Sequence, residues 1–491
     1  MTGDLLGDDL SVLTVGAELF ADSLRAQACP VEQVDWRPPP FGEVTDIAAV
    51  AADLRRVDAN RTALERVLAA GAELVDVLPA GQAIGMSAGT FFHAGPPLIW
   101  DRASGPMRGA LIGAMLFEGL ADTADAAEQA LASGDGITLE PCHHHAAVGP
   151  MAGVISPSMW VFQLRDPVHG RTAYCSLNEG LGKVLRYGAY SEEVLTRLRW
   201  MSDVLGPALK AAVRAHGPID IKAIVAQMLQ MGDEGHNRNR AGTLMLLREL
   251  LGDLIETSGP DTADVVRFIA GNDHFFLNLV MPAAKLALDA ARDIPGATMV
   301  VAMARNGTDF GIQVAGTGDE WFTGPAQVPE GLFLGSYGPD DANPDIGDSA
   351  ITETLGLGAF SMAAAPAIVR FVGGDVPLAL TTTRSMYDIT LGENPAFGIP
   401  ILEFRGAPTG IDVLAVVRTG VLPQINTGMA GKVAGTGQVG AGLVKPPPDC
   451  FQAALRSLAE RTPGVSSQAE RTPGVSSQCD GGFNRTYPTD R

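Results

Sequence analysis

Cysteine and basic residues are both scarce in this sequence. Five cysteines occur in 491 residues, at irregular spacing and with no CxxC pair, so no disulfide framework is expected and a reducing compartment fits best. The 35 Lys and Arg residues are outnumbered by 56 Asp and Glu, which gives a net charge of −21. A basic surface for nucleic acid is therefore not expected, although a local pocket for a small anion is compatible with this charge.

Targeting and membrane-spanning segments are also lacking. The first ten residues contain three Asp and no basic residue, unlike a secretory or transit peptide. The longest stretch without a charged residue, 141–164, contains three His and three Pro, which a span of about 20 apolar residues would not tolerate. We therefore expect a cytoplasmic protein with no membrane partner.

Glycine and proline are abundant. The 58 Gly and 33 Pro exceed the average share of roughly 12%, which indicates many special turns. At roughly 150 residues per domain, the length predicts an α+β or α/β multidomain protein. We expect an N-terminal α/β domain at 1–190 that begins with a strand–helix–strand unit, a helical domain at 191–295 and a C-terminal α/β domain at 296–458. A disordered tail is expected at 459–491, because AERTPGVSSQ occurs there twice and buries little apolar surface.

The densest polar cluster, GDEGHNRN at 232–239, interrupts the helical region. Polar residues at such a break have a structural use as helix caps, but capping needs only one or two of them. The surplus indicates a functional site. The candidates are Asp233 and Glu234 as bases, His236 or Arg238 as a proton donor or anion ligand, and Asn237 as a substrate ligand.

A second cluster, GNDH at 271–274, precedes another helical pattern. The structural interpretation is that Asn272 or Asp273 caps this helix. The functional interpretation adds His274, because a helix N-terminus disfavours the imidazolium and leaves a neutral ring able to donate or accept a proton. We keep His274 as a catalytic candidate, and Asn272 and Asp273 as substrate ligands.

Three consecutive histidines follow Cys142. Imidazole and thiolate are good zinc ligands, but in a strand alternate side chains point to opposite faces, so the three rings could not easily share one ion. A metal site, a substrate-binding strand end and a structural polar strand all stay open. We favour the strand end and expect no metal, with His143, His144 and His145 as catalytic candidates.

Other polar residues could bind a small anion. A helix predicted at 107–121 starts with GPMRG, where free N–H groups lie near Arg108, although close packing of its glycines explains the motif equally well. The run NEGLGK at 178–183 lacks the pattern of a P-loop. The acidic segment 340–353 is expected to be a solvated loop in which Asp348 caps a helix. The remaining substrate-binding candidates are Arg108, Asn178, Glu179, Lys183, Arg186, Asn306, Asn394 and Arg405.

Several of these stretches, taken together and in this order, resemble the YlbE-like family, whose members are encoded beside FdrA-like proteins. The likeness covers roughly residues 10–455 and leaves out the duplicated tail. It rests on HAGPPLIWDRASGPMRGALIGAMLFEGLA, LEPCHHHAAVGPMAGVISPSM, YCSLNEGLGKVLRYGAY, GDEGHNRN, FIAGNDHFFLNL, AMARNG, YGPDDANPDIGDSAITET, GENPAFGIP and FRGAPTGID.

The resemblance implies a subunit of oxamate carbamoyltransferase, a transferase of allantoin and purine catabolism. This enzyme converts oxalurate and phosphate to oxamate and carbamoyl phosphate. The implied partners are these small anions, FdrA-like and further subunits, and a possible second copy of the chain; no cofactor is implied. The motifs Ser-x-Arg-Thr-Arg and His-Pro-x-Gln of aspartate and ornithine carbamoyltransferases are absent, so their fold and mechanism are not expected.

Residues and resemblance together give one hypothesis and two alternatives. We expect a site between the first α/β domain and the helical domain, with His143–His145 facing His236 across a cleft. The first alternative is a metal-dependent amidohydrolase that uses the histidine cluster. The second is a non-catalytic scaffold subunit of an FdrA-like complex.

Overall fold

The computed structural model describes residues 12–15, 18–34 and 38–463. Most of the predicted tail, including the second copy of the decapeptide, lies outside the described residues. Its first residues differ from the expectation, because Ala459 and Glu460 end the amphipathic helix α17 (Pro448–Glu460). Apolar side chains of this helix are buried at its helical spacing, which explains why the chain stays folded to this point.

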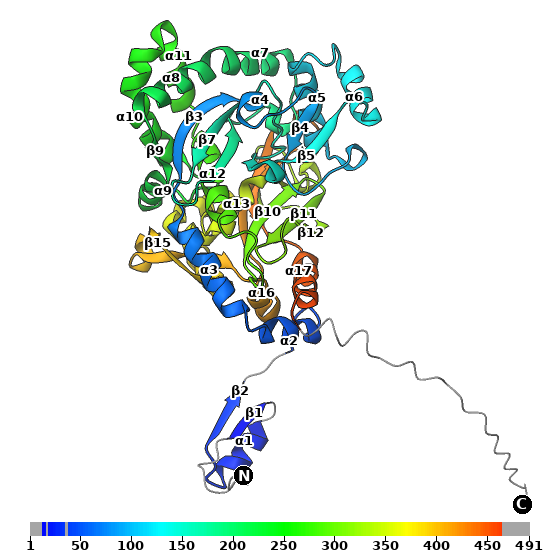
Figure 1. Cartoon of the computed structure of the whole chain (residues 1–491), viewed down its shortest axis with the longest axis vertical. Helices are drawn as coiled ribbons and strands as arrows, with labels where there is room; N and C mark the ends of the chain where they lie inside the picture. Colours follow the sequence, from blue (N-terminus) through cyan, green and yellow to red (C-terminus); the bar gives the residue numbers. More distant parts are fainter. Residues whose placement is uncertain (1–11, 16–17, 35–37, 464–491) are drawn as a thin grey trace, which may run out of the picture.

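The N-terminal residues form the predicted strand–helix–strand unit, which lies apart from the remaining described chain (Figure 1). Strands β1 (Val12–Val15) and β2 (Val31–Val34) pair in parallel, and α1 (Glu18–Arg25) connects them. The helix α2 (Val44–Ala52) follows and packs against α17 and α16 (Val413–Thr419).

A five-stranded sheet forms the core of the upper half in Figure 1. Its order is β6-β8-β7-β3-β9, and only the β6–β8 pair is parallel. A separate parallel pair, β4 and β5, lies beside it. The elements here are α3 (Arg56–Ala69), β3 (Glu73–Pro79), α4 (Ala80–Ala83), β4 (Thr90–His93), α5 (Gly105–Phe117), α6 (Ala124–Ser133), β5 (Thr138–Pro141), β6 (Ala147–Val148), β7 (Trp160–Arg165), β8 (Thr172–Ser176) and β9 (Ile219–Asp220).

Helices dominate the next stretch of the chain. Helix α12 (Leu277–Asp289) is buried along its whole length. Most of its residues are apolar, and its buried Lys285 and Asp289 pair with each other over 2.7 Å. None of the helices in the described ranges has the length and apolar character of a membrane span. The other helices are α7 (Glu192–Trp200), a π-helical turn (Met201–Leu205), α8 (Gly206–His216), α9 (Ile221–Gln230), α10 (Arg240–Thr257) and α11 (Thr262–Ala270).

The C-terminal part contains three small antiparallel sheets with the orders β12-β11-β10-β14, β13-β18-β17 and β15-β16. Short helices connect their strands. The elements are β10 (Val300–Asn306), β11 (Asp309–Val314), β12 (Phe322–Pro325), β13 (Glu330–Phe333), β14 (Ile346–Gly347), α13 (Ile351–Leu355), α14 (Val369–Val372), α15 (Val376–Met386), β15 (Thr390–Ile399), β16 (Arg405–Ile411), β17 (Ile425–Ala430) and β18 (Gln438–Val444).

One large apolar core connects these parts. Its buried side chains run from Ala59 to Ala430 and come from all three regions expected from the sequence. The α+β class is confirmed, with several small sheets in place of one large sheet. Because the core crosses the expected boundaries, the division into domains stays a prediction.

Candidate functional site

The loop between α9 and α10 folds around the carboxylate of Glu234. Backbone N–H groups of Asn237 and Arg238 donate to this carboxylate over 2.5 and 3.1 Å. Gly235 turns the chain with a φ of +88°, a conformation that glycine adopts without strain. The loop is therefore held by its own acidic side chain, and this fixes the positions of His236 and Asn237.

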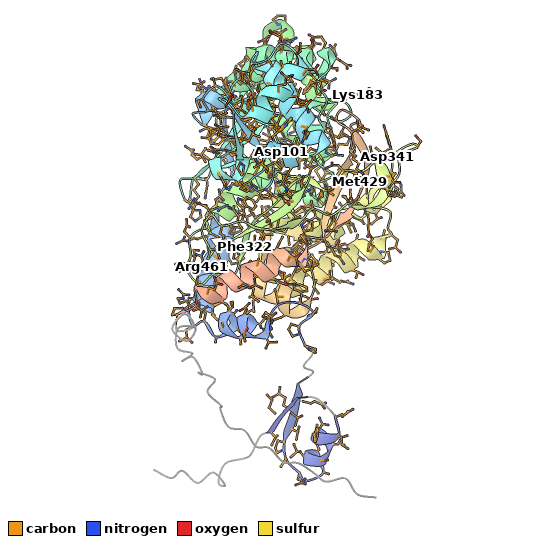
Figure 2. All side chains as sticks on the ribbon, turned by 90° about the vertical axis from the view of Figure 1, so that its right-hand side faces the viewer. Asp101, Lys183, Phe322, Asp341, Met429 and Arg461 are labelled. Atoms are coloured by element: carbon orange, nitrogen blue, oxygen red, sulfur yellow. The ribbon has the colours of Figure 1, made fainter. Side chains whose placement is uncertain are left out.

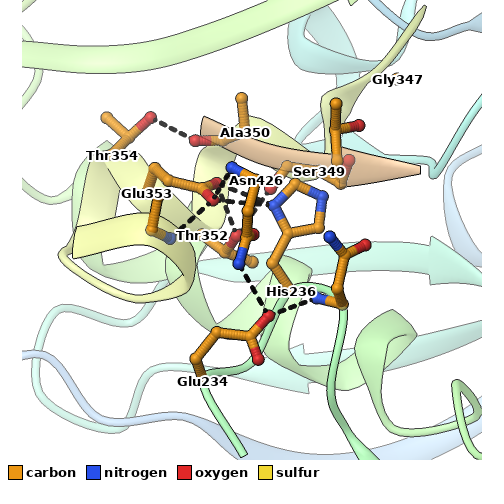
Figure 3. Close-up of polar contacts among 12 residues, drawn as sticks. Glu234, His236, Gly347, Ser349, Ala350, Thr352, Glu353, Thr354 and Asn426 are labelled. Atoms are coloured by element: carbon orange, nitrogen blue, oxygen red, sulfur yellow. Dashed lines mark hydrogen bonds and ion pairs between the residues drawn. The ribbon is translucent and has the colours of Figure 1, made fainter. Parts of the chain in front are cut away.

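His236 is oriented by Glu353, which lies in helix α13 (Figure 3). Nδ1 of His236 lies 2.9 Å from both carboxylate oxygens, and both side chains are buried. The carboxylate also accepts hydrogen bonds from Thr352 Oγ1 and from the N–H of Ala359. Because the Glu353 carboxylate accepts a hydrogen bond from the Nδ1–H group, Nε2 is the ring nitrogen left for a ligand.

The buried carboxyl of Glu234 forms a second acidic group in this cluster. Burial raises the pKa of Glu234 to about 7, and the nearby charge of His236 partly offsets this effect. Asn426 Nδ2 donates to Glu234 over 3.1 Å, while the backbone N–H of Asn426 donates to Glu353. Strand β17 thus connects the two carboxylates on either side of His236 (Figure 3).

A small pocket lies beside the His236 ring. The three regions of the chain all contribute to its wall, whereas the sequence suggested a site between the first two. The lining residues are Pro150, Met151, Arg186, Tyr187, His236, Asn237, His274, Leu277, Ser349, Gly428 and Gln438.

Several polar atoms around this pocket have no protein partner. Among the described residues, nothing hydrogen-bonds to the buried atoms Arg186 Nε, Asn237 Nδ2 and Ser349 Oγ. Folded proteins rarely leave buried polar atoms unpaired, because each costs about 1–3 kcal/mol. Two donors and a hydroxyl beside this pocket are therefore free to bind a small polar group.

The charge of the pocket suits a small anion. Arg186 is buried, and its guanidinium donates to the carbonyl oxygen of Gly180 over 2.6 Å. Burial lowers the pKa of His274 to about 3, and the charges of Arg186 and His236 act in the same direction. Such a low pKa keeps the His274 ring neutral near pH 7. The cause is burial and not the helix N-terminus considered from the sequence, because α12 begins three residues later at Leu277. Arg186 supplies a fixed positive charge.

Four further candidates hold the backbone that carries the pocket-lining residues. Glu179 accepts hydrogen bonds from the N–H groups of Leu185 and Arg186, which fixes the 3-10 turn η3 (Leu185–Tyr187). Asn178 and Asn272 hydrogen-bond to each other and to the chain around His274. Asp233 accepts from the N–H of Ala241 at the start of α10. These four residues hold neighbouring backbone and do not line the pocket.

The other cationic candidates lie away from the pocket. Lys183 is exposed at the surface (Figure 2), and the three arginines bind nearby protein atoms. Their partners are the carbonyl of Ala103 for Arg108, the carbonyl of Gly232 for Arg238 and the carboxylate of Glu393 for Arg405.

The last three substrate-ligand candidates also have structural contacts. Asp273 is exposed and lies 3.7 Å from Arg240. Asn306 is buried, where its amide donates to Pro96 O and its oxygen accepts from the N–H of Asp309. Asn394 is buried and accepts from the N–H of Ala396. None of the three lines the pocket beside His236.

The three consecutive histidines form a 3-10 turn, η2 (Cys142–His145), at the end of β5, and not the strand considered above. The chain turns because Pro141 ends the strand and Ala146 adopts a φ of +53°. The rings meet three different groups and do not line the His236 pocket. The contacts are Asp348 for His143, the indole N–H of Trp321 for His144 and Glu140 for His145.

The acidic segment 340–353 is largely buried at its end, which corrects the expectation of a solvated loop. Asp345 forms a bidentate ion pair with Arg305, over 2.7 and 3.0 Å. Asp348 caps no helix of its own, because its two oxygens accept from the N–H groups of Gly95 and Gly149. These contacts place residues 347–353 against the pocket.

Ser349, Glu353 and Asn426 were missed as candidates. The sequence motif YGPDDANPDIGDSAITET contains the first two, but its acidic residues suggested solvent exposure. Glu353 and Ser349 are buried together with their neighbours Asp345 and Asp348, and the sequence does not show which of these side chains line the pocket. Asn426 lies in a largely apolar strand, and a single polar amide there was the only feature of the sequence that could have marked it as a site residue.

Comparisons with known proteins identify the family of the chain. A family model described as "Oxamate carbamoyltransferase subunit AllG" matches residues 137–349. Oxamate carbamoyltransferase subunit AllG of Escherichia coli (strain K12) is 46% identical over 408 residues, which cover 82% of this chain and 97% of that protein.

Two further relatives extend the likeness. The Escherichia coli (strain K12) protein named "Uncharacterized protein YahG" is 45% identical over 470 residues, or 94% of this chain and 99% of that protein. A crystal structure titled as a conserved protein of unknown function from Enterococcus faecalis V583 has a TM-score of 0.81 at 46% identity and covers 83% of this chain and 98% of its own. The chain therefore belongs to the family of the oxamate carbamoyltransferase subunit AllG.

Proposed function

We propose that this chain is a carbamoyltransferase subunit that uses the pocket beside His236 to transfer a carbamoyl group between a ureido acid and phosphate. Membership of the AllG family supports the reaction class. The observation that carries the assignment of the pocket is the set of unpaired polar atoms on Arg186, Asn237 and Ser349 around one imidazole.

Transfer of the carbamoyl group from oxalurate to phosphate requires one bond to form, one bond to break and one proton to move. An oxygen of phosphate bonds to the ureido carbon of oxalurate, and the bond from this carbon to the oxamate nitrogen breaks. The proton that phosphate loses is gained by the leaving nitrogen, so one group that carries a proton between them is sufficient. The products are carbamoyl phosphate and oxamate.

The lining residues match these demands. Arg186 provides positive charge for phosphate or for the carboxylate of the ureido acid. Asn237 Nδ2 donates to the carbonyl oxygen, on which negative charge develops during transfer. Nε2 of His236 carries the proton, and neutral His274 accepts or donates a hydrogen bond without adding charge.

Other subunits belong to this proposal. The name of the AllG relative describes a subunit, and an FdrA-like protein is the partner that the family resemblance implies. In the scaffold alternative, the partner holds all the catalytic groups. The amidohydrolase alternative loses its main support, because the three histidines at 143–145 meet separate partners.

An assay of carbamoyl phosphate formation tests the proposal. The chain is purified with its co-expressed neighbouring subunits and supplied with oxalurate and phosphate, and oxamate and carbamoyl phosphate are measured. His236→Asn should lower kcat at least about tenfold, or about 1.4 kcal/mol. His216→Asn, at an exposed position of α8, is the matched control and should leave kcat unchanged. Full activity of the His236 variant supports the scaffold alternative.

A further inference from the structure

Ser349 and Glu353 approach the same imidazole from one short helical segment. The 3-10 turn η7 (Asp348–Ala350) continues directly into α13, and a spacing of four residues puts two side chains on the same helical face. Glu353 binds Nδ1 of His236, while Ser349 and His236 line the same pocket. Figure 3 shows Ser349 beside the His236 ring.

The hydroxyl of Ser349 differs from the neighbouring hydroxyls. Thr352 Oγ1 lies within hydrogen-bond distance of both the carbonyl oxygen of Ser349 and the Glu353 carboxylate. Thr354 Oγ1 donates to the carbonyl oxygen of Ala350. Ser349 Oγ has no hydrogen-bond partner among the described residues, even though the residue is almost fully buried, at 1% exposure. The one unused hydroxyl of this segment is the one at the pocket.

We propose that Ser349, His236 and Glu353 are a nucleophile, a base and an orienting carboxylate, and that the carbamoyl group is transferred through a carbamoyl ester on Ser349. This inference rests on the proposed function and gives it a two-step route. Such triads are recognised by their roles and geometry: a nucleophile beside a base, and a third group that orients the base. Glu353 binds the base here, whereas Ser349 Oγ forms no hydrogen bond with His236 among the described residues. The two-step route therefore requires Ser349 Oγ to turn to Nε2 of His236 when substrate binds.

In the first step Ser349 Oγ bonds to the ureido carbon and gives its proton to Nε2 of His236. The bond from this carbon to the oxamate nitrogen breaks, and the nitrogen takes the proton from His236. In the second step an oxygen of phosphate bonds to the carbamoyl carbon and gives its proton to His236. The bond to Ser349 Oγ then breaks, and Oγ regains the proton as carbamoyl phosphate leaves.

The surroundings of Ser349 suit both steps. Asn237 Nδ2 is an unpaired N–H donor on the same pocket, and each step develops negative charge on the same carbonyl oxygen. Burial of Ser349 and His236 excludes water. A carbamoyl ester in this position would otherwise lose its carbamoyl group to water instead of phosphate.

An isotope-exchange experiment separates the two-step route from direct attack of phosphate. The complex with its partner subunits is incubated with carbamoyl phosphate and radiolabelled phosphate, with no oxamate present. A carbamoyl ester predicts that label enters carbamoyl phosphate, because the second step can run in both directions without oxamate. Direct attack predicts no exchange until oxamate is added.

Ser349→Ala is the key variant, and Ser156→Ala is its matched control. Both hydroxyls are buried and have no hydrogen-bond partner within residues 12–15, 18–34 and 38–463, so neither substitution removes a hydrogen bond seen there. Ser156 does not line the pocket. Ser349→Ala should lose exchange and overall turnover by at least about a hundredfold. Ser156→Ala should keep both. Mass spectrometry of the complex treated with oxalurate alone should find one added carbamoyl group on the Ser349 peptide.

The outcomes distinguish the triad from the proposed function. Turnover of oxalurate without exchange, or an active Ser349→Ala complex, overturns the carbamoyl ester and leaves the proposed function standing. A folded wild-type complex that makes no carbamoyl phosphate from oxalurate overturns the proposed function, and the triad with it.

Discussion

Glu353 holds Nδ1 of His236 at 2.9 Å with both of its carboxylate oxygens, although the two residues are 117 positions apart in the chain. The pair joins the loop after α9 to helix α13. Glu353 also accepts hydrogen bonds from Thr352 Oγ1 and from the backbone N–H groups of Ala359 and Asn426. Its carboxylate is therefore held in place beside the imidazole, and the two side chains should work as one unit.

The first prediction is that substitutions of this pair are not additive. His236→Asn and Glu353→Gln should each lower kcat at least about tenfold, because the first removes the proton carrier and the second removes the acceptor that selects its tautomer. The double variant should be no slower than the worse single variant.

Kinetics of the four proteins, with thermal unfolding of each, give the measurement. Losses that multiply in the double variant would show that the two residues act independently. The unfolding data are needed because Glu353 also accepts from Ala359 and Asn426.

The second prediction concerns Asn237. Its side-chain nitrogen has no hydrogen-bond partner in the part of the chain that the structure describes, so Asn237→Ala should leave the free energy of unfolding unchanged within about 0.5 kcal/mol. If the amide stabilises charge on the carbonyl oxygen, kcat should nevertheless fall by about a hundredfold or more.

Asn426→Ala provides the contrast for this prediction. Its amide donates to the buried carboxylate of Glu234, and loss of this bond should cost about 1–3 kcal/mol of stability. Denaturant unfolding and kinetics of both variants compare the two effects. An Asn237→Ala protein with full activity would remove this amide from the mechanism.

The third prediction is a pH dependence of stability that comes from Glu234. Burial raises the pKa of this carboxyl from 4.5 to about 7 in the folded chain. Between these values the folded state keeps a proton that the unfolded state has released. Stability from this group is therefore complete below about pH 4.5 and is lost as the pH rises to about 7.

Glu234→Gln tests this assignment, because the amide resembles the protonated acid in shape and charge. The free energy of unfolding of this variant should fall less than that of the wild type between about pH 5 and pH 7. Glu256→Gln, at an exposed position of α10, should follow the wild type. Parallel curves for wild type and Glu234→Gln would contradict a raised pKa at this position.

Local patterns predicted a good part of the fold. The strand–helix–strand unit at the N-terminus was predicted, as was the polar break between α9 and α10, because apolar periodicity and turn residues act over short distances. Polar residues in turn-rich stretches supplied the candidates Arg186, His236, Asn237 and His274, and these four residues line one pocket.

Long-range contacts account for the rest of the site. Nothing in the spacing of His236 indicates that its partner is Glu353, and the acidic neighbours of Glu353 suggest solvent. Asp345 and Asp348 are buried because Arg305 and two backbone N–H groups from distant segments satisfy them. Such compensation depends on tertiary structure, which a single sequence does not display.

The last prediction concerns the buried ion pair that supports residues 347–349. Arg305 donates to both oxygens of Asp345 and to the carbonyl oxygen of Gly347, and both charged side chains are fully buried. Removal of one partner leaves an uncompensated charge. Asp345→Asn should therefore lower the free energy of unfolding by about 3–5 kcal/mol.

Asp58→Asn is the matched control, because the exposed ion pair of Asp58 and Arg61 should contribute less than about 1 kcal/mol. Denaturant unfolding of both variants measures the two losses. Since Arg305 also holds the carbonyl of Gly347, two residues before Ser349, the folded Asp345→Asn protein should lose activity as well. Full activity together with a small loss of stability would mean that the Arg305–Asp345 pair does not position the Ser349 segment.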